Sequence, residues 1–153
     1  MSHELHLHKI GPINDCQLTL DSFTILTGPQ ANGKSTAAKA VYFFRSVKQD
    51  ILSIMMQGGP NAVTGDKAST WSTVLKQRMK DKFLQLFGTS WVMPSDMRME
   101  YQYSKDVSIT VSLEEDFNDS SKNYIVIDFG KSIEDYLEAL SLHIFTNITP
   151  AQK

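Results

Sequence analysis

Apolar and polar residues alternate at the start of the chain. Leu alternates with His in residues 4–10 (ELHLHKI), and apolar residues alternate with Gln and Thr in residues 16–20 (CQLTL). Successive side chains of a strand point to opposite faces, so each stretch predicts a strand with one buried face. The turn GPIND separates them, and the apolar, β-rich SFTIL at residues 22–26 predicts a third strand.

The period then changes to that of helices. One apolar stripe predicts a helix from about Gly33 to about Met56, and another predicts a helix from about Ser69 to about Phe87, capped by Gly88. The polar stretch between them, residues 57–68, contains Gly and Pro and is typical of a loop.

Strict alternation returns in the last third. Residues 97–103 and 107–113 predict two strands joined by a short hairpin loop, and NYIVIDF at residues 123–129 predicts another strand. Ser132, with Asp135 three residues later, marks the start of a last helix. We therefore predict an α/β fold with a mixed sheet around the strand that ends at Thr27, an antiparallel hairpin and flanking helices.

Composition narrows the class of protein. The chain has 153 residues, of which 41% are hydrophobic and 21% charged, as in a single globular domain. A net charge of −2 argues against a broadly basic DNA-binding surface. The single cysteine, Cys16, excludes an internal disulfide and fits a reducing compartment. No segment is suited to a signal peptide or a bilayer span, so we expect a cytoplasmic protein with no membrane partner.

The strongest chemical signal lies between the third predicted strand and the first predicted helix. Gly28, Gly33, Lys34 and Ser35 fit the phosphate-loop pattern G-x-x-x-x-G-K-[ST]. A chance match in a chain of this length has a probability under ~1%. A strand before the loop and a helix after it are the context that the motif requires.

Each residue type in the loop has a role toward a nucleotide. Gly28 lets the chain leave the strand at dihedrals that other residues resist, and Gly33 lets the backbone close around a phosphate. Lys34 places a charge on the β- and γ-phosphates, the Ser35 hydroxyl is the expected Mg²⁺ ligand, and Thr36 caps the helix or contacts the α-phosphate. We predict that ATP and Mg²⁺ bind to Gly28, Pro29, Gln30, Ala31, Asn32, Gly33, Lys34, Ser35 and Thr36.

The stretch from Leu5 to Arg45 resembles the N-terminal lobe of ABC-type ATPases of the SMC/RecF/OLD kind. That lobe has a strand, a GPI-like turn, a second strand, a loop of the form G-P-N-x-x-G-K-S-T and a helix. Here Gln30 replaces the usual Asn, and Asn32 stands where Ser or Ala is common. Beyond Arg45 the resemblance is only architectural.

The resemblance implies a composite ATPase site. One subunit brings the phosphate loop, a glutamine loop and a Walker B Asp–Glu pair, and a second head brings an L-S-x-G signature across a head-to-head dimer. It also implies a homodimer, with ATP binding and hydrolysis coupled to work on DNA or on an attached effector such as a nuclease, in DNA repair or defence.

The other motifs of such a site are not evident. Asp128 ends the apolar run YIVIDF, but Phe129 stands where the catalytic Glu belongs, so an ordinary strand is the favoured interpretation. Ser141 follows a Leu as in the signature, but His143 stands in place of Gly. Gln57 and Gln102 are equally weak candidates for the glutamine loop, and the catalytic residues stay unassigned.

We therefore expect residues 1–153 to form one ATP-binding lobe, as the N-terminal piece of a longer ATPase, with negligible hydrolysis by itself. Its expected parts are strand–strand–loop–helix in residues 1–56, a loop and helical insertion in 57–94, and a hairpin, strand and helix in 95–153.

Three alternatives stay open. A small phosphotransferase, such as a nucleotide or metabolite kinase, suits the length, although Arg45, Arg78 and Arg98 are scattered and form no arginine-bearing lid. A regulatory module that holds a nucleotide without turnover is the second. A GTPase is less favoured, because no N-K-x-D guanine reader occurs.

Two further clusters have a chemical and a structural interpretation. His6 and His8 share a strand face, as two metal ligands would, but no carboxylate partner is evident, and an exposed strand face is favoured. Tyr101 and Tyr103 beside Arg98 suit base stacking, but their alternation with polar residues favours a place in the core.

Overall fold

A computed structural model describes the backbone of residues 1–146 and the side chains of residues 1–142. Five strands form one open sheet in the order β2-β1-β3-β4-β5, and every neighbouring pair is antiparallel. The strands are β1 His3–Ile10, β2 Ile13–Leu20, β3 Arg98–Ser104, β4 Val107–Glu115 and β5 Asn123–Phe129.

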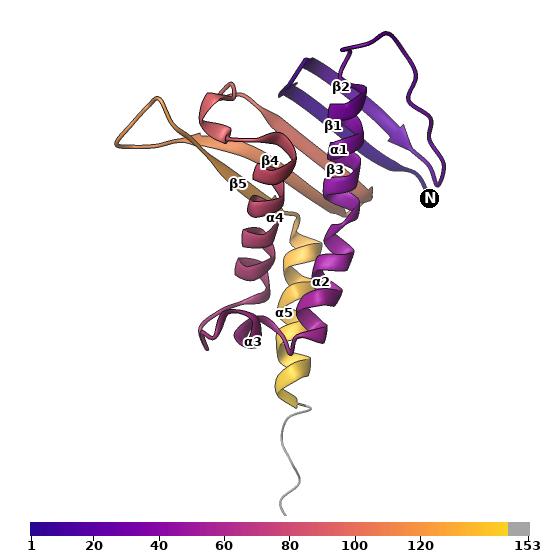
Figure 1. Ribbon diagram of the computed structural model, residues 1–153. Helices are drawn as coiled ribbons and strands as arrows, with labels where there is room; N and C mark the ends of the chain where they lie inside the picture. The colour runs from indigo at the N-terminus through magenta and orange to yellow at the C-terminus, as the bar shows by residue number, and fades with distance from the viewer. Residues whose placement is uncertain (147–153) are drawn as a thin grey trace, which may run out of the picture.

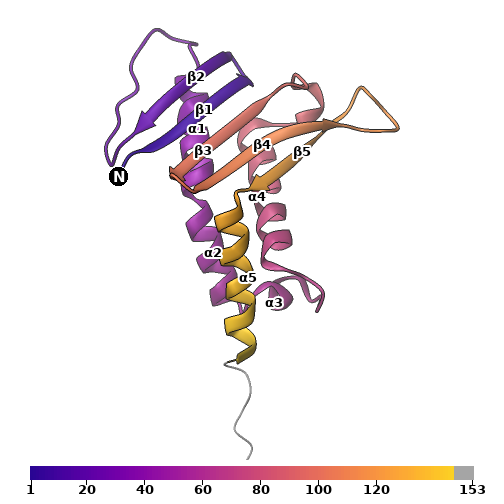
Figure 2. The same ribbon diagram turned by 180° about the vertical axis from the view of Figure 1, so that it is seen from behind.

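Helices cover only one face of this sheet, and the remaining helices extend beyond its lower edge in the view of Figure 1 (Figures 1 and 2). The helices are α1 Lys34–Arg45, α2 Val47–Met56, α3 Pro60–Thr64, α4 Trp71–Phe87, the 3-10 turn η1 Ser90–Val92 and α5 Lys131–Thr146. The protein is thus an α/β fold of two layers. None of the helices in the described part of the chain is long and apolar enough to cross a membrane.

The core lies between the inner face of the sheet and the helices. Leu5, Leu7 and Tyr101 are fully buried on the sheet, and they face Phe43 and Phe44 of α1. The residues that alternate with them form a polar outer face, which is free of helices (Figure 2). The alternation therefore predicted the five strands of the sheet correctly, since each has one buried face.

The predicted mixed sheet around a strand ending at Thr27 is wrong. The sheet is antiparallel throughout, and residues 21–33 contain no strand. Within the described residues, no backbone–backbone hydrogen bond involves residues 22–27. This segment leaves the end of β2 and curves outside the sheet to reach α1 (Figure 2), and the side chains of Phe23 and Ile25 are 79% and 68% exposed. We call residues 22–27 the approach segment.

The predicted long helix from Gly33 to Met56 is two helices. α1 ends at Arg45 and α2 begins at Val47, and Ser46 joins them with nearly helical dihedrals (φ −75°, ψ −9°). The Ser46 hydroxyl donates to the Phe43 carbonyl at 3.0 Å and accepts from Lys82 of α4 at 2.7 Å. Ser46 keeps its own helical bonds, from its N–H to the Tyr42 carbonyl at 2.9 Å and from the Asp50 N–H to its carbonyl at 3.1 Å. The break is therefore a local distortion at the serine, of the kind that hydroxyl-to-backbone bonding produces.

The other predicted elements agree with the structure, with small shifts at their ends. α4 begins at Trp71, after Thr70, whose hydroxyl accepts from the Thr73 backbone N–H at 3.2 Å, and Gly88 follows its last residue. The predicted loop 57–68 contains the short helix α3. The division of residues 1–153 into three parts within one lobe stays a prediction, and residues 147–153 lie outside the described chain.

Candidate functional site

The phosphate loop connects the approach segment to α1. Gly28, Ala31 and Gly33 all have positive φ angles, of 148°, 65° and 83°. Gly33 is the residue that precedes α1, and its carbonyl accepts the first helical bond from Ala37 at 2.9 Å. Among the described residues, no side chain caps this helix end. The first backbone N–H groups of α1 therefore remain for an anion.

The Lys34 side chain folds back over the loop. Its ammonium donates to the Gly28 carbonyl at 2.7 Å and to the Pro29 carbonyl. The positive charge is thus held at the opening of the loop, next to the helix N-terminus. Phosphate oxygens are stronger partners for an ammonium than neutral carbonyls, so a phosphate can replace them.

The turn between β1 and β2 packs against the loop and fixes it. A Cβ atom added to Gly33 would lie 2.5 Å from Ile13 Cγ1, and one added to Gly11 would lie 3.2 Å from Thr36 Oγ1. Gly33 is therefore required for packing against the sheet, in addition to the role toward a phosphate that the sequence predicts. Sequence reasoning assigned only the second role, although the turn GPI was visible as a signal.

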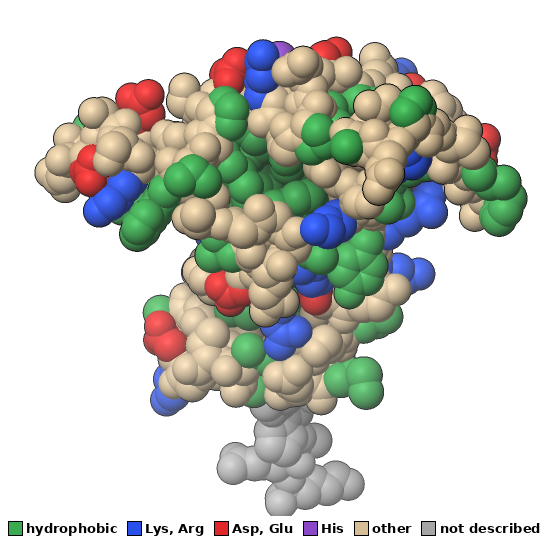
Figure 3. Space-filling model, turned by 45° about the horizontal axis from the view of Figure 1, so that its top comes forward, with side chains coloured by type: hydrophobic (Ala, Val, Ile, Leu, Met, Phe, Trp, Pro, Cys, Tyr) green, Lys and Arg blue, Asp and Glu red, His purple; other side chains and the backbone are tan. Residues whose placement is uncertain are grey.

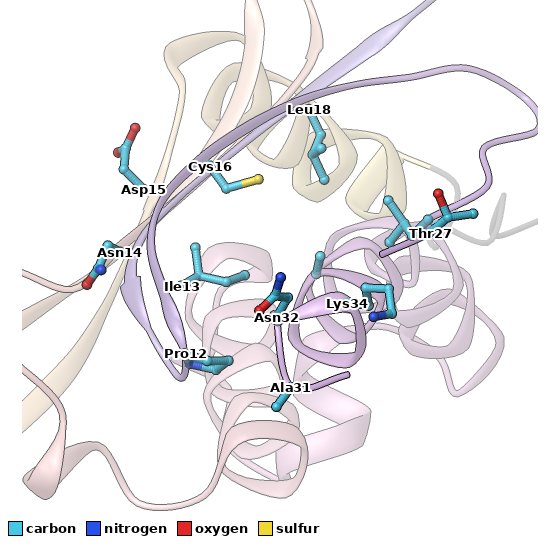
Figure 4. Close-up of a pocket in the computed structure, with 13 residues that line it drawn as sticks. Pro12, Ile13, Asn14, Asp15, Cys16, Leu18, Thr27, Ala31, Asn32 and Lys34 are labelled. Carbon is cyan, nitrogen blue, oxygen red and sulfur yellow. The ribbon is translucent and has the colours of Figure 1, made fainter. Parts of the chain in front are cut away.

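A pocket of about 500 Å³ lies between the loop, β2 and the end of the approach segment. Figure 4 shows Ile13 and Cys16 of β2 on one side of it and Asn32 and Lys34 of the loop region on another. The approach segment contributes Leu26 and Thr27 to its wall. The space beside β2 where a hydrogen-bonded neighbour strand was expected is thus a pocket.

Arg45, the last residue of α1, holds Asp21, the residue before the approach segment. Its guanidinium donates to the Asp21 carbonyl at 3.1 Å and to the Tyr101 hydroxyl at 3.1 Å. The same hydroxyl lies 2.7 Å from Nδ1 of His3. Burial, and then the charge of Arg45, lower the pKa of His3. Because the guanidinium donates to the tyrosine oxygen, the hydroxyl is free to donate to a neutral His3.

The structure separates the Walker B candidate from the loop. Asp128 lies on β5, three places from β1 in the sheet, which corresponds to about 14 Å. It pairs with Thr110 of β4, and its side chain is exposed on the outer face, opposite to the helices. Asp128 therefore belongs to an ordinary strand and does not reach a metal bound at Ser35.

The two glutamine candidates also lie away from the loop. Gln57 follows the last residue of α2, where its side chain donates to Ser53 Oγ at 3.0 Å. Gln102 lies on β3 and donates to the Lys105 carbonyl at 3.2 Å. Ser141, from the signature candidate, lies within α5 and donates to the Leu137 carbonyl at 3.2 Å.

The histidine pair has a carboxylate partner that sequence reasoning missed. Asp15 of β2 lies opposite His8 of β1, and its Oδ1 is 2.8 Å from His6 Nε2 and 3.2 Å from His8 Nδ1. These hydrogen bonds, the one from His6 first, lower the pKa of Asp15. No group of three His, Cys, Asp or Glu residues in the described part of the chain fits a metal ion. The cluster is therefore a polar network on the outer face.

Tyr101 belongs to the core, and Tyr103 packs against it. Tyr101 is fully buried and stacks on Phe44 with ring centroids 5.2 Å apart. Tyr103 donates from its hydroxyl to the Phe44 carbonyl at 2.5 Å, and burial raises its pKa far above the usual range. The predicted place in the core is confirmed for Tyr101, and Tyr103 is partly buried against it.

No protein-family model, no curated protein and no solved structure matches this chain. The geometry of the phosphate loop is therefore the basis for a functional assignment.

Proposed function

We propose that this protein binds ATP with Mg²⁺ through residues 28–36. The observation that carries the proposal is the placement of the complete motif at the uncapped N-terminus of α1, with the Lys34 ammonium held over the loop. Backbone N–H groups, the positive end of the helix and a lysine together form the type of site that holds a polyphosphate.

The roles follow from position. Lys34 exchanges the Gly28 and Pro29 carbonyls for β- and γ-phosphate oxygens. Ser35 is exposed in the first turn of α1, so its hydroxyl is available to a Mg²⁺ ion that also binds the phosphates. Among the described residues, Asp128 is too distant to add a ligand or to orient water. We therefore assign nucleotide binding to this chain and not hydrolysis.

The wider proposal is a head of an SMC/RecF-like ABC ATPase that works on DNA or on an attached effector. The order strand, turn, strand, loop and helix supports it, together with the packing of the turn on the loop at Gly33. The approach segment also supports it, because residues 22–27 make no backbone–backbone hydrogen bond within the described chain, which leaves their N–H and C=O groups for a further strand to pair with. In this proposal, hydrolysis requires such added elements and a second head.

A small phosphotransferase receives less support. Arg45 bonds Asp21 and Tyr101, Arg78 donates to Ser53 at 3.1 Å, and Arg98 contacts Glu100 at 3.3 Å. These arginines therefore make structural contacts away from the loop, whereas a kinase needs arginines on the transferred phosphate.

Calorimetric titration of the purified chain with ATP and Mg²⁺ tests the proposal. Lys34→Ala should weaken binding by at least about tenfold, since it removes the positive charge that contacts the phosphates. Lys48→Ala, which removes an exposed lysine of α2, is the matched control and should leave the affinity unchanged. Equal affinities for the two variants would contradict the proposal.

Ser35→Ala should remove the dependence of affinity on Mg²⁺ while leaving metal-free binding nearly intact. The unaltered chain should release negligible phosphate over hours. Brisk hydrolysis would show that a catalytic acid lies within these residues, and preference for GTP in competition would favour a GTPase.

A further inference from the structure

A second pocket, of about 400 Å³, opens on the other side of the β1–β2 turn from the loop pocket. Its apolar wall comes from the end of α4 and from η1 and the residue after it, through Leu86, Phe87, Val92 and Met93. Val92 is 83% exposed, so apolar surface is open to solvent here. Figure 3 shows hydrophobic side chains gathered in a hollow between the regions of α4 and α1. We call it the α4 pocket.

The α4 pocket shares the first turns of α1 with the phosphate loop. Thr36 and Lys39 line it, and Ser35, the proposed Mg²⁺ ligand, directly precedes Thr36. Thr36 to Lys39 spans about 4.5 Å along the helix axis. The lining of the α4 pocket therefore begins one residue after Ser35, on the same helix as the proposed phosphate site.

The wall of the α4 pocket is held in place by the core. The Phe87 ring lies 4.9 Å from the Phe83 ring and 6.4 Å from the Phe43 ring, and both of these partners are fully buried. The hydroxyl of Thr89, another lining residue, accepts from the Trp91 backbone N–H at 3.4 Å. A largely apolar pocket with a few fixed polar groups is typical of a small-molecule site.

We propose that the α4 pocket receives the nucleoside part of the nucleotide whose phosphates bind residues 28–36. The inference rests on the proposed function and adds to it the place of the base. The base lies against Phe87, Val92 and Met93, where aromatic and apolar surface is available for stacking. Lys39, an exposed side chain one turn after Thr36, lies at the junction with the ribose and the α-phosphate. Phe87, Val92 and Met93 lie outside the stretch from Leu5 to Arg45 that resembles ATPases.

The test compares ATP with inorganic tripolyphosphate, which carries the phosphates without a nucleoside. Calorimetric titration of the whole chain with Mg²⁺ should show ATP binding at least about tenfold more tightly. The double variant Val92→Ser, Met93→Ser should lower the ATP affinity about fivefold or more and leave tripolyphosphate affinity unchanged. Leu52→Ser, which alters a 48% exposed leucine of α2, is the matched control and should change neither affinity.

A second measurement needs no variant. Trp91 directly precedes Val92 of the pocket wall and is 50% exposed, whereas Trp71, the other tryptophan, is 2% exposed. ATP should therefore change the tryptophan emission, and tripolyphosphate should leave it unchanged.

The outcomes separate the two proposals. If ATP and tripolyphosphate bind equally and both depend on Lys34, the α4 pocket is not the nucleoside site, while the phosphate loop stands. If ATP binds more tightly but the double variant keeps its full affinity, the nucleoside lies elsewhere, and the inference is wrong. If neither ligand binds, the proposed function and this inference both fail.

Discussion

β1 and the approach segment are similar in sequence and opposite in structure. Leu5 and Leu7 of β1 are fully buried, and hydrogen-bonded strands flank β1 on both sides. Phe23 and Ile25 of the approach segment are as apolar, yet they are exposed, and the backbone around them pairs with no strand in the described chain. Side-chain pattern thus provides a strand's tendency to form, and a neighbour with free N–H and C=O groups decides whether it forms.

The comparison is tested most directly by the same substitution in the core that β1 packs against and in the approach segment. Phe43→Ala removes a fully buried ring between the Phe44, Phe83 and Phe87 rings, and should lower the free energy of unfolding by about 3–5 kcal/mol. Phe23→Ala removes a 79% exposed ring and should change it by less than about 0.5 kcal/mol. Urea unfolding of both variants measures the difference, and comparable losses would show that the approach segment is packed in solution.

A smaller effect distinguishes two glycines of the loop. Both have positive φ, but only Gly33 faces Ile13, at 2.5 Å from an added Cβ, while nothing lies within 4 Å at Gly28. Gly33→Ala should therefore cost about 1–3 kcal/mol through strain and overpacking, and Gly28→Ala about 1 kcal/mol through backbone strain alone. Thermal unfolding of the two variants compares these costs.

The control repeats the Gly33→Ala substitution in a protein that already carries Ile13→Ala. The Gly33→Ala cost should shrink there toward that of Gly28→Ala, because the clashing side chain is gone. A cost unchanged by the second substitution would locate the effect in the backbone and not in the contact with β2.

The strands of the sheet could be predicted because each carries its own signal. In β3 and β4 every second residue is apolar, which predicts two strands, and the short connecting loop predicts that these strands pair with each other. Residues 22–26 are also β-rich, but pairing is a relation between two segments, and the sequence of one segment cannot supply it. The break at Ser46 was missed because it accompanies bonds of the serine hydroxyl to Phe43 and Lys82 and leaves the apolar period unchanged.

The candidate site was predictable only as far as it is local. Gly28, Gly33, Lys34 and Ser35 lie within eight consecutive positions, so their spacing alone predicts the candidate loop. The contact of Ile13 with Gly33 joins residues far apart in the chain, and periodicity carries no information about it. The wall of the α4 pocket was missed for the same reason. The sequence predicts a helix end at Phe87 and a loop at Met93, and it does not indicate that the two lie together.

Two arginine substitutions should change the free energy of unfolding by smaller amounts. Arg45→Met removes two hydrogen bonds, to the Asp21 carbonyl and the Tyr101 hydroxyl, and should cost about 1–2 kcal/mol. Arg98→Met removes an ion pair with Glu100 whose partners are 54% and 38% exposed, and should cost no more than about 0.5 kcal/mol. Urea unfolding ranks the two variants, and an equal cost would show that Arg45 does not hold Asp21, the residue before the approach segment.

The smallest expected effect is a dependence of stability on pH that arises from His3 of β1, which lies beside Arg45. The folded protein lowers the pKa of His3 from its usual 6.5, through burial first and then the Arg45 charge, so the unfolded chain binds the proton more readily. Stability contributed by neutral His3 is therefore complete above about pH 6.5 and is lost as the pH falls through the lowered pKa. The urea midpoint of unfolding should decrease as the pH is lowered from 7.5 to 5. His3→Gln, which cannot titrate, should flatten this dependence of the midpoint on pH. A slope that persists in His3→Gln would assign the dependence to other groups.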